Sequence, residues 1–130
     1  MSVQASFKTT SNTTAEGWLK KEGHDIIRSW NDRYFVLDSA KKRIAYYSEE
    51  QKLNLKGEYE FTGNSMVENS NQPSAHPNLF FVIGKSAKGD PKSELLMSAS
   101  SAEVKNKWMD AIKKAIKVIF SICMIINLFN

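Results

Sequence analysis

The side chains of this chain that could do chemistry are mainly cationic. Its 130 residues include 18 Lys and Arg against 14 Asp and Glu, which gives a formal net charge of +4. A surplus of cations favours an anionic partner, but nucleic acid, anionic lipid and acidic proteins all satisfy that condition. The positions of the cations must therefore decide what kind of anion they bind.

Arg33 has an informative position. It lies in the run 30–37 (WNDRYFVL), which is aromatic and β-branched and predicts a strand. Phe35 and Leu37 share its parity, so all three side chains face the same side of that strand. If this side is the core, Arg33 is tolerable only at an open end, where it meets water or an anion. Tyr46 shares a face with Ile44 in the same way and brings a hydroxyl toward that end.

Catalytic and metal-binding patterns are missing from the sequence. It contains no GxSxG, P-loop or HExxH motif, and no Ser/His/Asp set is apparent. Cys123, His24 and His76 cannot form a four-ligand zinc site unless carboxylates join them. The sequence therefore predicts a protein that is not an enzyme and has no metal or cofactor. One cysteine also excludes an internal disulfide framework, which favours a reducing, cytoplasmic location.

Short strands are expected along most of the chain. Turn-forming clusters separate the apolar runs, which lie at 17–21, 30–37, 43–48, 57–61, 66–67, 79–83 and 94–99. Strands at this spacing predict an antiparallel sandwich or barrel and not a parallel sheet with intervening helices.

A helix is expected after the last strand. Ser100 and Glu103 have the spacing of a capping box, with Ser100 as the N-cap. An apolar stripe with spacings of three and four follows, formed by Val104, Trp108, Ala111, Ile112, Ala115 and Ile119. The predicted fold is therefore mainly β, with about seven strands and one C-terminal α-helix.

Three segments are predicted along the chain. Residues 1–14 are rich in Ser, Thr and Asn and predict a flexible lead, 15–117 form the domain, and 118–130 form an apolar tail. The tail is shorter than the roughly 20 residues that span a bilayer. We considered three roles for it: a helix extension buried against the domain or a second copy, an interfacial membrane insertion, or a disordered, non-native segment. Packing or self-association is favoured, because an exposed apolar stripe promotes aggregation.

The order of these motifs closely resembles that of pleckstrin-homology domains. The resemblance covers about residues 16–117 and is carried by Gly17-Trp18-Leu19 with Lys21, Trp30-x-x-Arg33-Tyr34-Phe35-Val36-Leu37, Ile44-x-Tyr46-Tyr47, Lys56-Gly57 and the capped helix with Trp108. It implies a seven-stranded antiparallel barrel or sandwich that is open at one end and capped by the helix at the other.

The resemblance also implies a ligand site at the open end. The positions that match the family's headgroup-binding residues are Lys21, Arg28, Arg33, Tyr46 and Lys56. An inositol polyphosphate needs convergent donors, and Arg offers a planar fork, Lys a compact charge and Tyr a hydroxyl. A loop that carries Lys85, Lys88 and Lys92 is expected to border the same end.

The family's phosphoinositide signature is incomplete in this chain. It expects a second basic residue directly after the tryptophan of the second strand, where this sequence has Asn31 followed by Asp32. The parity of Asp32 is opposite to that of Arg33, so its carboxylate should point away from the open end. The sequence does not indicate which phosphoinositide is preferred.

The expected function is phosphoinositide-dependent recruitment to the cytoplasmic face of membranes during signalling. The alternative is a protein-interaction module on the same fold, with weak or no lipid specificity and with a possible protein partner or second copy at the 118–130 tail. Nucleic acid is not an expected partner, because the aromatic residues fall at core spacings and are not interleaved with basic residues as a stacking platform would require.

Overall fold

The computed structural model describes residues 6–23 and 29–129, with side chains as far as Lys117. The strands are β1 Lys8–Thr9, β2 Thr14–Glu22, β3 Trp30–Asp38, β4 Arg43–Tyr47, β5 Leu55–Glu60, β6 Met66–Asn69, β7 Leu79–Ser86 and β8 Ser93–Ser98, and they are followed by the helix α1 Ala102–Phe129.

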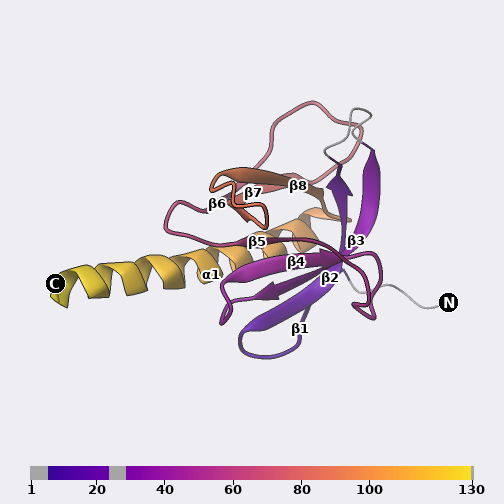
Figure 1. Cartoon of the computed structure of the whole chain (residues 1–130). Coiled ribbons are helices and arrows are strands. Elements are labelled where there is room, and N and C mark those ends of the chain that lie inside the picture. The colour runs from indigo at the N-terminus through magenta and orange to yellow at the C-terminus, as the bar shows by residue number, and fades with distance from the viewer. Residues whose placement is uncertain (1–5, 24–28, 130) are drawn as a thin grey trace.

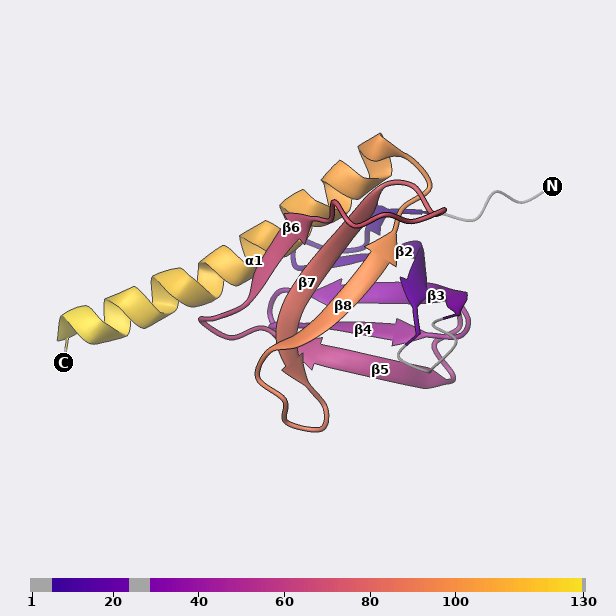
Figure 2. The same ribbon diagram turned by 90° about the horizontal axis from the view of Figure 1, so that it is seen from above.

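All the strand pairings are antiparallel, and they close the sheet on itself. The strand order is β1-β2-β3-β4-β5-β7-β6, and β8 pairs with both β7 and β2. Figures 1 and 2 show β2 to β5 as one layer, β7 and β8 crossing it, and α1 lying beside β6 before it runs out past both layers. This is the helix-capped antiparallel barrel that the sequence predicted.

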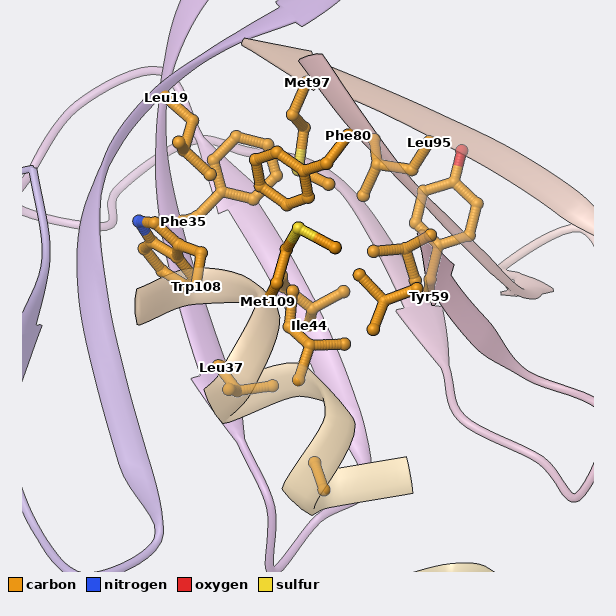
Figure 3. Packing of buried hydrophobic residues seen from close by; sticks show 14 of the residues in the cluster. Leu19, Phe35, Leu37, Ile44, Tyr59, Phe80, Leu95, Met97, Trp108 and Met109 are labelled. Carbon is orange, nitrogen blue, oxygen red and sulfur yellow. The ribbon is translucent and has the colours of Figure 1, made fainter. Parts of the chain in front are cut away.

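The core lies between the two layers and the first turns of α1. Trp108 and Ile112 are fully buried, and the Trp108 ring packs against Phe35 with 6.4 Å between the ring centroids. Figure 3 shows Trp108 and Met109 pointing from the helix toward the side chains of the sheet. The predicted apolar stripe therefore forms the helix's contribution to the core, as far along the helix as side chains are described.

The segment expected to be a flexible lead contacts the barrel. Residues Lys8 and Thr9 form β1 against β2, and the Trp108 Nε1–H donates a hydrogen bond to the Ser6 carbonyl over 2.8 Å. The Phe7 ring meets Trp108 edge-on at 5.1 Å between centroids. The structure thus contains an additional strand, which the sequence did not predict because its two residues show no apolar alternation.

The N-cap of α1 is Ser101, and the prediction of Ser100 is wrong by one residue. The Ser101 Oγ accepts the Val104 N–H over 3.1 Å, and its carbonyl accepts the Lys105 N–H. Ser100 instead donates its hydroxyl to Ser6, and Glu103 forms an ion pair with Lys107 at 3.3 Å. The helix therefore begins one residue later than the predicted capping box implies.

The backbone of residues 118–129 continues α1 beyond the barrel (Figures 1 and 2). The packing or self-association predicted for this tail stays a prediction. Across the part of the chain that the structure describes, no helix is both long and apolar enough to cross a membrane.

Candidate functional site

Strands β2 and β3 bring Lys21 and Arg33 to the same face of the sheet. Lys21 lies opposite Asn31, and Arg33 lies opposite Leu19, a core residue. Along β3, exposure falls from Asn31 through the half-buried Arg33 to the buried Phe35. Arg33 therefore lies where the core ends and solvent begins, as its parity predicted.

Lys21 is a buried cation. Its side chain is only 7% exposed, its Nζ donates to the Glu22 carbonyl over 3.0 Å, and the same atom lies 5.0 Å from the centre of the Tyr46 ring. Burial, together with the nearby charge of Arg33, lowers the pKa of Lys21. An ammonium group in such surroundings is stabilised by any anion that reaches it.

Tyr46 forms the floor beneath this cation. It is 8% exposed, and its ring stacks on Tyr59 at 6.4 Å between centroids. Burial and the neighbouring Tyr59 raise the pKa of Tyr46, while the charge of Arg33 opposes that shift. Gly57 lies directly opposite on β5, and a Cβ at Gly57 would overlap the Tyr46 hydroxyl. Glycine is thus required here by close approach of the tyrosine, and the phenol remains protonated as a donor.

Arg33 is held in place by the backbone of its own strand. One guanidinium nitrogen, NH1, donates to the Asp32 carbonyl over 2.9 Å, which leaves other N–H groups of the fork available. Within the described residues, neither Arg33 nor Lys21 forms an ion pair with a carboxylate. Lys21, Arg33 and Tyr46, which we call the mouth cluster, therefore present donors without a carboxylate among them.

Asp32 points to the opposite face of the sheet, as predicted from its parity. Its carboxylate accepts a hydrogen bond from the Lys20 Nζ over 3.0 Å, and both residues are exposed. Lys20 and Asp32 are cross-strand partners, and their opposite charges compensate each other on the outer face of the barrel. The acidic residue that interrupts the family signature is kept away from the mouth cluster.

Among the described residues, Lys56 is a predicted ligand residue with no contact to the mouth cluster. Lys56 is exposed on β5, in a bulge where Tyr46 pairs with Gly57 and Tyr47 pairs with Leu55. Arg28 falls outside the described residues. Lys85 and Lys88 line a separate hollow of about 480 Å³ together with Lys41, Arg43, Glu58 and Glu60. The family resemblance predicts that the loop carrying Lys85 and Lys88 borders the open end of the barrel, whereas the hollow that these lysines line contains no residue of the mouth cluster.

Two features of the site had no clear signal in the sequence. Tyr59 supports the Tyr46 ring, although nothing in its local motif GEYEF marks a functional role. The depth at which Lys21 is buried is also a tertiary feature, because a lysine at a strand end is usually solvated. In the described chain, no group of three or more His, Cys, Asp or Glu side chains could hold a metal ion.

Comparison with known proteins places this helix-capped barrel in a defined class. A family model for the PH domain matches residues 13–117. The chain belongs to the PH domain family, which is a non-catalytic module.

The curated relatives are much longer than this chain. Rho GTPase-activating protein 25 is 26% identical over 102 residues in Mus musculus and 28% identical over 102 residues in Homo sapiens. The matched region is 75% of this chain but only 15% of those relatives.

Solved structures share the fold. The human PH domain of oxysterol binding protein-related protein 11 has a TM-score of 0.66 at 20% identity, over 86% of this chain and 87% of the other. The C-terminal PH domain of pleckstrin, in complex with D-myo-Ins(1,2,3,5,6)P5, has a TM-score of 0.64 at 24% identity, over 78% and 92%. At these identities the likeness establishes the fold alone.

Proposed function

We propose that this domain binds the inositol polyphosphate headgroup of phosphoinositides at the mouth cluster and so docks on the cytoplasmic face of membranes. The observation that carries the proposal is that the Lys21 ammonium lies over the Tyr46 ring, close enough to Arg33 for the two charges to interact, while no described carboxylate forms an ion pair with either cation. A buried cation without an anionic partner is costly, and a phosphate would supply that partner. The pleckstrin domain of the same fold, solved with an inositol phosphate, supports this ligand class.

Each member of the cluster has a distinct part in the proposed complex. Arg33 offers its remaining N–H groups as a fork to one phosphate, and Lys21 adds a compact charge. Tyr46 donates its hydroxyl, which stays protonated because burial raises the pKa of Tyr46. Arg28 and Lys56 are proposed as outer contacts, since both match basic positions of the family pattern.

Titration calorimetry with inositol hexakisphosphate tests this proposal. Charge-assisted hydrogen bonds contribute roughly 1.5–3 kcal/mol each, so Arg33→Ala and Lys21→Ala should each weaken binding about 10-fold or more. Lys20→Ala is the matched control, because it removes the same charge from the opposite face, where Lys20 pairs with Asp32. We expect it to change the affinity less than about 3-fold.

Two results would contradict the proposal. If Lys20→Ala weakens binding as much as Arg33→Ala, the ligand responds only to overall charge. If the wild-type chain does not bind the headgroup, the protein-interaction alternative is favoured.

A further inference from the structure

Two leucines are unusually exposed where the loop between β4 and β5 meets β5: Leu53 lies in the loop and Leu55 is the first residue of β5. Leu53 is 79% exposed and Leu55 is 52% exposed; among the described residues, the only other exposed large apolar side chain is Met66 on β6, at 43%. Single exposed apolar residues are common on protein surfaces. Leu53 and Leu55 are only two positions apart, and together they form an apolar tip, which we call the leucine tip.

The leucine tip lies at the same end of the sheet as the mouth cluster. The β4–β5 register pairs Tyr46 with Gly57 and Tyr47 with Leu55, so the loop leaves β4 directly beyond Tyr46. Antiparallel pairing puts the end of β4 beside the beginning of β3, where Arg33 lies. A surface that meets the mouth cluster at this end therefore also meets the loop.

The loop is ordered by one carboxylate. Glu49 accepts hydrogen bonds from the N–H groups of Leu53 and Asn54 over 2.8 and 2.7 Å, and from the Asn54 side chain over 2.8 Å. The Ser48 hydroxyl donates to the same carboxylate over 2.8 Å. These bonds hold Leu53 in place without covering its side chain, so little conformational entropy remains to be lost when it binds.

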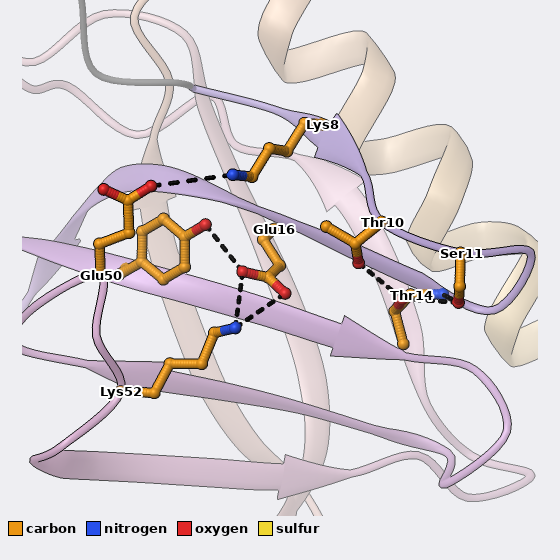
Figure 4. A network of polar contacts seen from close by, with 8 residues as sticks. Lys8, Thr10, Ser11, Thr14, Glu16, Glu50 and Lys52 are labelled. Carbon is orange, nitrogen blue, oxygen red and sulfur yellow. Dashed lines mark hydrogen bonds and ion pairs between the residues drawn. The ribbon is translucent and has the colours of Figure 1, made fainter. Parts of the chain in front are cut away.

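The charged residues of the loop are turned back onto the barrel. Lys52 Nζ lies 2.9 Å from a Glu16 carboxylate oxygen, and Glu50 pairs with Lys8 at 3.8 Å. Figure 4 shows both side chains reaching from the loop along the outer face of β1 and β2. Because Glu49 and Glu50 are both engaged, the tip presents leucines next to the exposed cation Lys56.

We propose that Leu53 and Leu55 insert into the headgroup–acyl boundary of a phospholipid bilayer while the mouth cluster holds a headgroup. The inference rests on the proposed function, since headgroup binding would orient this end of the barrel toward the membrane. A lipid surface fits the tip because it accepts apolar side chains flanked by cations. The leucines thereby add an affinity for membranes that a soluble headgroup cannot use.

Comparison of vesicle binding with soluble-headgroup binding tests the insertion. The double variant Leu53→Ala/Leu55→Ala should bind inositol hexakisphosphate like the wild type, while its partition onto vesicles of phosphatidylcholine, phosphatidylserine and a polyphosphorylated phosphatidylinositol falls about 10-fold. Met66→Ala is the control for loss of an exposed apolar side chain, and its partition should stay within about 2-fold of the wild type.

A fluorophore reports insertion directly. In a chain carrying Cys123→Ser, an environment-sensitive dye on Leu53→Cys should shift to the blue on those vesicles, and the same dye on Met66→Cys should not. Unchanged vesicle partition of the double variant together with no blue shift at position 53 would overturn the insertion even if the soluble headgroup binds. Vesicle binding that depends on the leucines, without soluble-headgroup binding, would support the insertion and contradict the proposed function. Absence of all vesicle binding by the wild type overturns the insertion as well.

Discussion

At the scale of single residues, the burial of Lys21 bears on the stability of the domain and, if the proposed function holds, on ligand binding. Burial and the charge of Arg33 both disfavour its protonated form, which lowers the pKa of Lys21 below its ordinary value of 10.5. The folded domain therefore disfavours the charged ammonium of Lys21 relative to the unfolded chain. This is the condition in which a residue serves ligand binding at the expense of the free domain's stability.

Replacing Lys21 by an apolar residue of similar length should stabilise the free domain. A buried ionic group replaced by a packed apolar side chain is often neutral or stabilising, so Lys21→Met should raise the free energy of unfolding by about 1 kcal/mol and Tm by roughly 3–5 °C. Below the lowered pKa of the folded state, the charged Lys21 ammonium reduces the free energy of unfolding. This reduction disappears as pH rises from that lowered pKa to 10.5, the pKa of Lys21 in the unfolded chain. The gain should therefore shrink at alkaline pH.

Thermal unfolding of Lys21→Met at neutral and alkaline pH checks this prediction, with Lys20→Met as the control on the opposite face. The same Lys21→Met protein should bind inositol hexakisphosphate more weakly than the wild type. A Lys21→Met domain that is less stable than the wild type at neutral pH would show that Lys21 is mainly a structural residue.

At the scale of elements, the beginning of α1 connects the chain's start to its core. Ser101 caps the helix through Val104, and the adjacent Ser100 contacts Ser6, whose carbonyl accepts the Trp108 N–H. The first turn of the helix, the β1 region and the Trp108 side of the core are thus adjacent. A loss of the cap should be transmitted to the packing of Trp108.

The two serines should differ in their effect on stability. Ser101→Ala removes the N-cap acceptor and should lower the free energy of unfolding by about 1 kcal/mol. Ser100→Ala removes only an exposed hydroxyl contact of 3.2 Å and should change it by less than about 0.5 kcal/mol. Chemical denaturation of the two variants checks the assignment. A larger loss from Ser100→Ala would mean that the capping box predicted from the sequence is the one that operates.

At the scale of the whole molecule, Glu16 connects the outer face of the sheet to the β4–β5 loop. The Tyr34 hydroxyl donates to its carboxylate over 2.8 Å, and Lys52 lies 2.9 Å away (Figure 4). Burial alone would raise the pKa of Glu16, but the hydrogen bonds from Lys52 and Tyr34 and the charges of Lys52 and Lys8 outweigh it, so the pKa is lowered from 4.5.

The lowered pKa of Glu16 predicts a specific acid sensitivity. Because the folded state favours the ionised carboxylate, its stabilisation is fully present above 4.5 and is lost as pH falls through the lower pKa of the folded state. Glu16→Gln should cost about 1 kcal/mol at neutral pH, and its difference from the wild type should diminish as pH falls below 4.5 and through the lowered pKa of Glu16.

Urea denaturation at a series of pH values measures this difference. Glu58→Gln is the control, since its ion pair with Arg43 is longer, at 3.8 Å, and more exposed. If the free energies of unfolding of the wild type and Glu16→Gln fall in parallel as pH is lowered, Glu16 does not contribute to the acid sensitivity of the domain.

The sequence by itself determined most of the elements and the faces of their side chains. Alternation in the run 30–37 predicted that Arg33 shares a face with Phe35, and the helical stripe predicted the burial of Trp108, both of which are confirmed. These features are local, because the period of a strand or helix assigns each residue's face without reference to the rest of the fold. The resemblance supplied the antiparallel barrel capped by a C-terminal helix, which the structure confirms.

Only the tertiary structure decided which side chains meet. That the Lys21 ammonium lies over the Tyr46 ring, and that Gly57 accommodates the Tyr46 hydroxyl, depends on pairing between strands that are distant in sequence. Such contacts follow from register and closure of the sheet, which local periodicity does not encode. The pairing of β1 has the same origin, because its register is set against β2 and not by its own two residues.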